Sequence, residues 1–170
     1  MSTPKRRKTL RIEIQPLDAR AARRAALDVL ARRDHASEDL RRKLLGKGYN
    51  PAVVEQVLER LVSEKLLDDH RYVASFVAYH AARGQGPLRV RADLHKKGMQ
   101  GSIVEECLQV FPDWLVHLRQ ASLKKFGTVP ASHYADKQRQ ARFLGCRGFT
   151  GAQIRMALGF DTDVGIDSEE

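Results

Sequence analysis

The sequence predicts an all-α protein built from three tandem three-helix repeats that form an elongated, curved molecule. One observation behind this prediction is a set of four positions that recur every 50 residues without a gap. These positions are Leu44, Leu94 and Leu144; Gly48, Gly98 and Gly148; Val54, Val104 and Ile154; and Leu58, Leu108 and Leu158. The other is the spacing of apolar residues at three and four, the period of an amphipathic helix. Because short helices cannot bury an apolar face alone, neighbouring repeats are expected to stack.

The helix signals place the repeats at residues 18–66, 67–111 and 112–160. A basic arm, residues 1–17, precedes them, and an acidic tail, residues 161–170, follows them. Neither flank has enough apolar residues in a regular pattern to form a packed core, so both are expected to be flexible.

Particular residues mark where the helices begin and end. Ser37 is expected to cap the second helix of the first repeat, with Leu45 on its apolar stripe. Asn50–Pro51 is expected to open the third helix, since proline is well tolerated at the first helical position. The repeated glycines are expected to end each middle helix. In the third repeat, the turn between the first two helices is predicted to be longer and to extend to about His133.

The chain is strongly basic, with 30 Lys or Arg residues against 21 Asp or Glu residues and a formal net charge of +9. The excess lies in the arm and in the repeats, whereas the tail is acidic. A field of this sign attracts nucleic acid or another polyanionic surface. The alternative explanation for the basic repeats is that surface lysine and arginine serve solubility.

The sequence contains no motif for covalent chemistry, a cofactor or a metal, so an enzyme is not expected. Asp68, Asp69 and His70 could suggest a metal site, but two carboxylates at a helix start are explained more simply by capping and the helix dipole. Cys107 and Cys146 lack a CxxC partner and are expected to be reduced, with Cys107 in the core. No secretory signal or membrane-spanning run is evident, which predicts a cytoplasmic protein.

Basic residues cluster in the helix before each repeated glycine. In the last helical turn, Lys47, Lys97 and Arg147 are explained by the helix dipole, which favours cations there by about 0.3–1 kcal/mol. The dipole does not explain the basic residues near helix starts, which are Arg89, Arg91 and Arg139. The second and third repeats are therefore expected to carry a strip that binds phosphates or acidic side chains.

Four groups of residues occur in an order that resembles the RecX family of recombinase regulators. The groups are Leu66-Leu67-Asp68-Asp69 with Arg71-Tyr72 and Ala74; Gly86 with Arg89-Val90, Leu94 and Lys97-Gly98; Lys125-Phe126-Gly127; and Arg142-Phe143-Leu144 with Arg147-Gly148-Phe149. The resemblance covers about residues 24–158. Where the family commonly has isoleucine after the repeat glycine, this chain has Met99, a change that conserves volume.

The resemblance implies three tandem three-helix repeats that bind the RecA filament on single-stranded DNA in its helical groove. It implies suppression of the filament's ATPase, strand-exchange and coprotease activities, and hence a role in recombination, DNA repair and the SOS response. It also implies direct DNA contact in some members. For this chain we expect at most weak direct DNA binding, a monomeric state, no membrane partner and no cofactor. The surface expected to bind the filament or DNA comprises Arg71, Arg89, Arg91, Lys96, Lys97, Arg139, Arg142 and Arg147.

A different class of function is a DNA-binding protein whose repeats read base edges as helix-turn-helix units. Its recognition helices would need polar residues such as Asn or Gln beside Arg. The third helices, at residues 53–61 and 103–111, are acidic or apolar instead, which disfavours this alternative.

Overall fold

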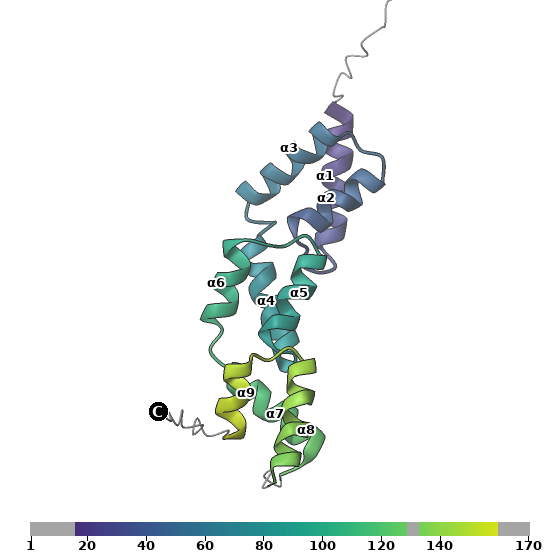
Figure 1. The fold of residues 1–170 in the computed structure, drawn as a ribbon. Coiled ribbons are helices and arrows are strands. Elements are labelled where there is room, and N and C mark those ends of the chain that lie inside the picture. The colour runs from purple at the N-terminus through teal and green to yellow at the C-terminus, as the bar shows by residue number, and fades with distance from the viewer. Residues whose placement is uncertain (1–15, 129–132, 160–170) are drawn as a thin grey trace, which may run out of the picture. The chain divides into compact units, whose positions relative to one another are not determined.

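The structure is a computed structural model that describes residues 16–128 and 133–159, and these residues form nine α-helices and no strand (Figure 1). The predicted all-α class and the three-helix repeats are confirmed. Most of the predicted basic arm and the whole acidic tail lie outside the described residues. The chain separates into two compact units, the first ending at Leu67 and the second beginning at Asp68.

The first unit contains one three-helix module. Its helices are α1 (Pro16–Leu30), α2 (Ser37–Gly46) and α3 (Pro51–Ser63). Each helix packs against the other two around a single apolar core. The core side chains are Ala22, Ala25, Ala26, Leu40, Leu44, Val53, Val54, Val57, Leu58, Leu61 and Leu67.

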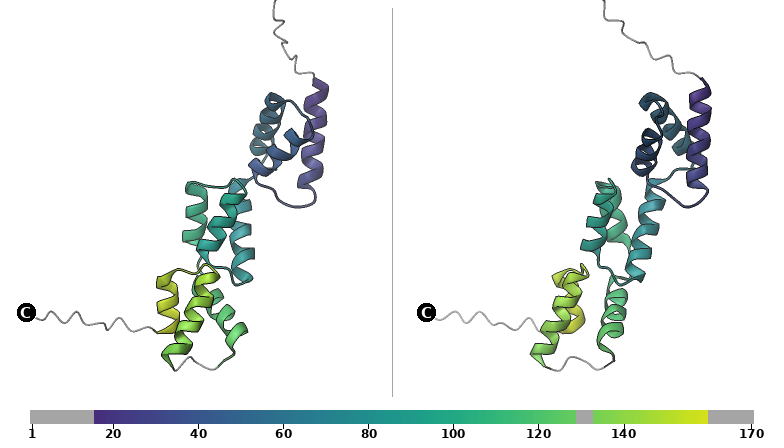
Figure 2. Two further views of the ribbon diagram at one scale, coloured as in Figure 1. Left: turned by 45° about the vertical axis from the view of Figure 1, so that its right-hand side comes forward. Right: turned by 90° about the vertical axis from the view of Figure 1, so that its right-hand side faces the viewer.

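The second unit contains the other two modules. The second module consists of α4 (Asp69–Ala82), α5 (Pro87–Lys96) and α6 (Ser102–Val110), and the third of α7 (Trp114–Phe126), α8 (Tyr134–Cys146) and α9 (Gly151–Leu158). Within each module the helices pack against one another, and α4 also contacts α7 across the two modules (Figure 2). None of the helices in the described residues is long and apolar enough to span a membrane.

The repeated positions play the same structural part in all three modules. Leu44, Leu94 and Leu144 are fully buried. The glycines four residues later have positive φ angles of 87°, 81° and 88° for Gly48, Gly98 and Gly148 respectively. Because L-residues with a side chain rarely adopt such angles, glycine ends these helices at little cost. The repeat therefore records a shared backbone turn as well as a shared core position.

Most predicted helix starts are confirmed, and two details are wrong. The Asn50 side chain accepts a hydrogen bond from the Ala52 backbone N–H at 2.9 Å, with Pro51 in the first turn of α3. By contrast, the residue before α2 is Ala36, and Ser37 is already helical, so Ser37 is not the cap. Leu45 is 38% exposed because the buried stripe of this short helix is formed by Leu40 and Leu44.

Candidate functional site

The second and third modules are joined where the N-terminus of α5 meets the C-terminal end of α8 (Figure 2). The Gly86 backbone N–H donates to the Arg147 carbonyl at 2.8 Å, and the Leu88 N–H donates to the Gly148 carbonyl at 3.0 Å. Helix ends leave such groups without intrahelical partners, so each end satisfies the other. The contact also aligns the two helix dipoles head to tail.

This junction needs glycine on both sides. A Cβ atom on Gly86 would lie 2.3 Å from the Gly148 carbonyl carbon, and a Cβ on Gly148 would lie 2.4 Å from the Arg89 Cβ. Gly148 also has its positive φ of 88°. Backbone atoms cannot yield as flexible side chains do, so the two modules meet at a separation that only glycine permits.

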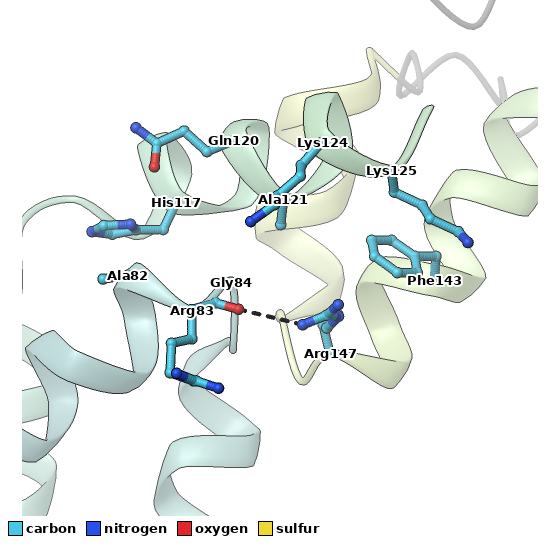
Figure 3. A pocket seen from close by; sticks show the side chains of 10 residues that line it. All are labelled: Ala82, Arg83, Gly84, His117, Gln120, Ala121, Lys124, Lys125, Phe143 and Arg147. Carbon is cyan, nitrogen blue, oxygen red and sulfur yellow. Dashed lines mark hydrogen bonds between the residues drawn. The ribbon is translucent and has the colours of Figure 1, made fainter. Parts of the chain in front are cut away.

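A hollow of about 370 Å³ opens beside this junction, between α7, the turn after α4 and the end of α8 (Figure 3). Lys124 and Lys125 project from α7 toward opposite sides in Figure 3, and Arg147 lies across from them at the end of α8. The Arg147 Nη1 donates to the Arg83 carbonyl at 3.3 Å, and its guanidinium lies 5.1 Å from the centre of the Phe143 ring. These two contacts hold the guanidinium at the edge of the hollow.

The hollow is cationic because basic residues line it and no acidic residue does. Among the described residues, no carboxylate pairs with Lys124, Lys125 or Arg147. Arg83 also borders the hollow, but its Nη1 donates to the Tyr79 hydroxyl at 3.3 Å, and in Figure 3 its guanidinium points away from the lysines. Lys124, Lys125 and Arg147 are hereafter called the cationic hollow residues.

Several residues of the predicted strip form an ion pair with a carboxylate on their own helix. The Arg89 Nε lies 3.2 Å from one Asp93 oxygen, and the Lys96 Nζ lies 3.3 Å from the other. Burial favours the protonated form of Asp93, but hydrogen bonds from these two cations outweigh it and lower the pKa of Asp93. Likewise, the Arg139 Nη2 lies 3.0 Å from the Asp136 carboxylate.

Arg91 is engaged by the following helix. Its Nε and Nη2 donate to the two Glu105 oxygens at 2.7 and 2.6 Å, which ties α5 to α6. Fifty residues upstream, Arg41 makes the same bidentate contact with Glu55, at 2.7 and 2.9 Å. Hydrogen bonding to Arg41 lowers the pKa of Glu55. The two pairs occupy equivalent positions of the repeat, so Arg91 has a structural partner within its own module.

We expect the Arg91–Glu105 pair to contribute about 0.5–1 kcal/mol to stability, because both side chains are partly exposed. The coupling is measured by a double-mutant cycle of Arg91→Ala and Glu105→Ala in urea denaturation. Combining Glu105→Ala with Arg142→Ala, which removes an arginine without a carboxylate partner in the described part of the chain, is the matched control and should show no coupling. Equal coupling in both cycles would contradict a specific pair.

Lys97, Arg142 and Arg71 are the other residues of the predicted strip. Lys97 lies over the Phe76 ring, with its Nζ 5.8 Å from the ring centre, and Arg142 is exposed on α8. Arg71 is in the first turn of α4, where its backbone N–H donates to the capping Asp68. Hydrogen bonding of this kind lowers the pKa of Asp68. The structure thus brings Arg147 to the junction and leaves Arg71 at the other end of α4.

Lys124 belongs to none of the patterns that the sequence offers, whereas Lys125 belongs to one of the family motifs. Both lie in the last turn of α7, where basic residues are explained by the helix dipole alone. The hollow also includes Arg83 and Gly84 from the turn after α4. Within residues 16–128 and 133–159, no cluster of three or more His, Cys, Asp or Glu side chains is arranged to hold a metal ion.

Comparisons with known proteins match the three modules in order. Family models described as the first, second and third three-helix domains of RecX match residues 22–61, 68–108 and 113–158. The chain is 40% identical over 138 residues to "Regulatory protein RecX" of Halorhodospira halophila, covering 81% of this chain and 86% of that protein. It is 42% identical over 140 residues to the protein of the same description from Pseudomonas fluorescens, covering 81% and 90%.

The fold is also similar to that of solved structures. The crystal structure of RecX from Lactobacillus salivarius superimposes with a TM-score of 0.76, at 18% identity, over 85% of this chain and 97% of that chain. A second, described as a crystal structure of regulatory protein RecX, has a TM-score of 0.69 at 23% identity and covers 85% of this chain and 72% of that one. At these identities the likeness concerns the fold.

Proposed function

This chain belongs to the RecX family of regulatory proteins, and on that basis we propose that it binds the RecA recombinase filament on single-stranded DNA. Binding inhibits the ATPase, strand-exchange and coprotease activities of the filament. The protein thereby modulates recombination, DNA repair and the SOS response in the cytoplasm. It acts as a non-enzymatic partner.

The observation that supports this proposal best is a set of cations in the second unit that its own carboxylates leave unneutralised. Among the described residues, Lys97, Arg142 and Arg147 have no carboxylate within ion-pair distance, and neither do the two lysines of α7. An uncompensated field of this kind attracts a polyanion and increases the rate of association with it. A filament of protein on single-stranded DNA offers phosphates and acidic side chains as such partners.

Within the predicted strip, the ion pairs suggest an order of importance. Arg89, Lys96 and Arg139 each form an ion pair with a carboxylate on their own helix, so each would have to break that pair before it could bind an acidic group of a partner. Lys97 and Arg147 have no such pair to break, and both occupy the C-cap position of the middle helix of their module. We therefore propose Lys97 and Arg147 as the main contacts and the paired cations as minor ones.

The experiment measures the RecA ATPase on single-stranded DNA at about 0.15 M salt, where long-range attraction between exposed charges is largely screened. The Lys97→Ala/Arg147→Ala variant is expected to need about 10-fold more protein for half-inhibition, equivalent to about 1.4 kcal/mol of lost contact energy. The Lys96→Ala/Arg139→Ala variant removes the same charge from paired positions and should stay within about 2-fold of the unmodified protein.

Three results would count against the proposal. Absence of inhibition by the unmodified chain would remove RecA as the partner. Equal loss in the two variants would show that net charge alone matters and that Lys97 and Arg147 are not special. Full inhibition by the Lys97→Ala/Arg147→Ala variant would remove these residues from the surface. Far-UV circular dichroism of each variant checks that helicity is unchanged.

A further inference from the structure

We propose that the cationic hollow of the second unit binds a compact polyphosphate, such as the phosphate chain of a nucleoside triphosphate or inorganic polyphosphate. This binding needs neither RecA nor DNA, so it goes beyond the proposed function. The ligand would lie between the two lysines of α7 and Arg147 at the end of α8 (Figure 3). The shared chemistry is a chain of adjacent phosphoryl groups.

Charge is the first argument for this ligand. Three cationic side chains surround one hollow, and within the described residues none of them is paired with a carboxylate. An anion in the hollow would gain Coulomb attraction from each of these cations. A single phosphodiester carries too little charge to neutralise three cations. Adjacent phosphoryl groups concentrate several negative charges and acceptor oxygens in a small volume.

Preorganisation is the second argument. The Arg147 guanidinium is held by the Arg83 carbonyl at 3.3 Å and by the Phe143 ring at 5.1 Å, and its remaining N–H groups are available for a ligand. Arginine presents its donors in a planar fork that suits phosphate oxygens. A side chain that is already ordered loses less conformational entropy on binding, so a smaller entropic cost offsets the free energy of each contact.

The wall and size of the hollow fit a small ligand. Its volume of about 370 Å³ is within the usual range for small-molecule sites. His117 lines the hollow, and its Nδ1 is buried without a hydrogen-bond partner in the described part of the chain. Because this nitrogen is shielded from solvent, it does not face the space that a ligand would occupy, and the contacts proposed for the ligand are those of the cationic hollow residues.

The aromatic residues argue for a compact ligand over a single strand of nucleic acid. Strand-binding grooves supply exposed aromatic faces on which bases stack. Here the Phe143 ring has the Arg147 guanidinium over it and contacts Phe126 edge to face, with ring centres 5.4 Å apart. The His117 ring stacks on Phe111, with centres 5.6 Å apart. Both rings that line the hollow are therefore occupied by neighbouring side chains, which leaves little surface for a base.

Isothermal titration calorimetry of the full chain at about 0.15 M salt tests the proposal, with inorganic tripolyphosphate as the first probe. We expect one saturable site. The Lys124→Ala/Lys125→Ala variant should bind about 10-fold more weakly, because each lost charge-assisted hydrogen bond is partly replaced by water. The matched control, Lys96→Ala/Arg139→Ala, has the same net charge but lies outside the hollow, and should stay within about 2-fold of the unmodified chain.

Two further titrations identify the source of the phosphates. Tighter binding of ATP than of tripolyphosphate would identify a nucleotide, and equal binding would show that the phosphate chain alone is read. Tighter binding of a thymidine oligonucleotide with the same number of phosphates would overturn the proposal in favour of a nucleic-acid strand. Absence of a saturable site, or an equal loss of affinity in the two variants, would also overturn it. None of these results depends on whether the chain inhibits RecA.

Discussion

Replacing Gly86 by alanine is expected to lower the free energy of unfolding of the second unit by about 3 kcal/mol or more. The added Cβ would lie 2.3 Å from the Gly148 carbonyl carbon and from the Phe149 backbone nitrogen. Relief requires α8 to move away from α5, which breaks the two backbone hydrogen bonds from Gly86 and Leu88. Urea denaturation followed by the fluorescence of Trp114 measures the effect, since this single tryptophan is buried in the second unit.

The control for this substitution is Gly145→Ala. Gly145 lies inside α8, has no positive φ, and an added Cβ would have nothing within 4 Å. Alanine is the better helix former, so this variant should be more stable by about 0.5–1 kcal/mol. If Gly86→Ala were as stable as Gly145→Ala, the close approach at the junction would not exist in solution.

The second large effect is expected for Leu94→Ala. Leu94 is fully buried, and truncation of such a side chain removes apolar contacts and leaves a cavity. The loss should be about 2–5 kcal/mol, depending on how far the surrounding helices relax. The same Trp114 fluorescence measures it.

Leu88→Ala is the matched control for Leu94→Ala, since it makes the same chemical change on the same helix at a side chain that is 48% exposed. It should cost less than about 1 kcal/mol. Comparable losses in the two variants would mean that the repeated leucine is not the core position of its module.

The parts of the fold that depend on local rules could be predicted from the sequence. Asn50–Pro51 and Asp68 begin helices because their side chains or ring suit a helix start, whatever lies around them. The repeated glycines end helices for an equally local reason. Ser37 failed as a predicted cap because Ala36, which is fully buried, takes the capping position. Burial of the neighbour was not visible in the sequence.

The ion pairs could have been predicted in part. The same Arg and Glu residues occur 14 positions apart at Arg41–Glu55 and at Arg91–Glu105, which is a second signal in the 50-residue repeat. The third repeat breaks it, with Ala141 and Arg155 at the equivalent positions. Comparison of the repeats would thus have identified Arg91 as a paired residue before any coordinates.

The cationic hollow could not be predicted from spacing. Lys124 lies on α7 and Arg147 caps α8, two helices that pack against each other, and the turn after α4 completes the hollow because α8 ends against the start of α5. That contact depends on the absence of side chains at Gly86 and Gly148, two positions whose glycines also serve ordinary turns. Each of these glycines is already explained by its turn, so the sequence gives no separate sign that it also permits the close approach of α8 to α5.

The end-to-end contact between α8 and α5 has a consequence for folding during translation. The acceptors for the first N–H groups of α5 are the carbonyls of Arg147 and Gly148, which are translated about 60 residues later. Until Arg147 and Gly148 have left the ribosome, water must hydrate this helix end, so the start of α5 reaches its final form only after the second half of α8 has been made.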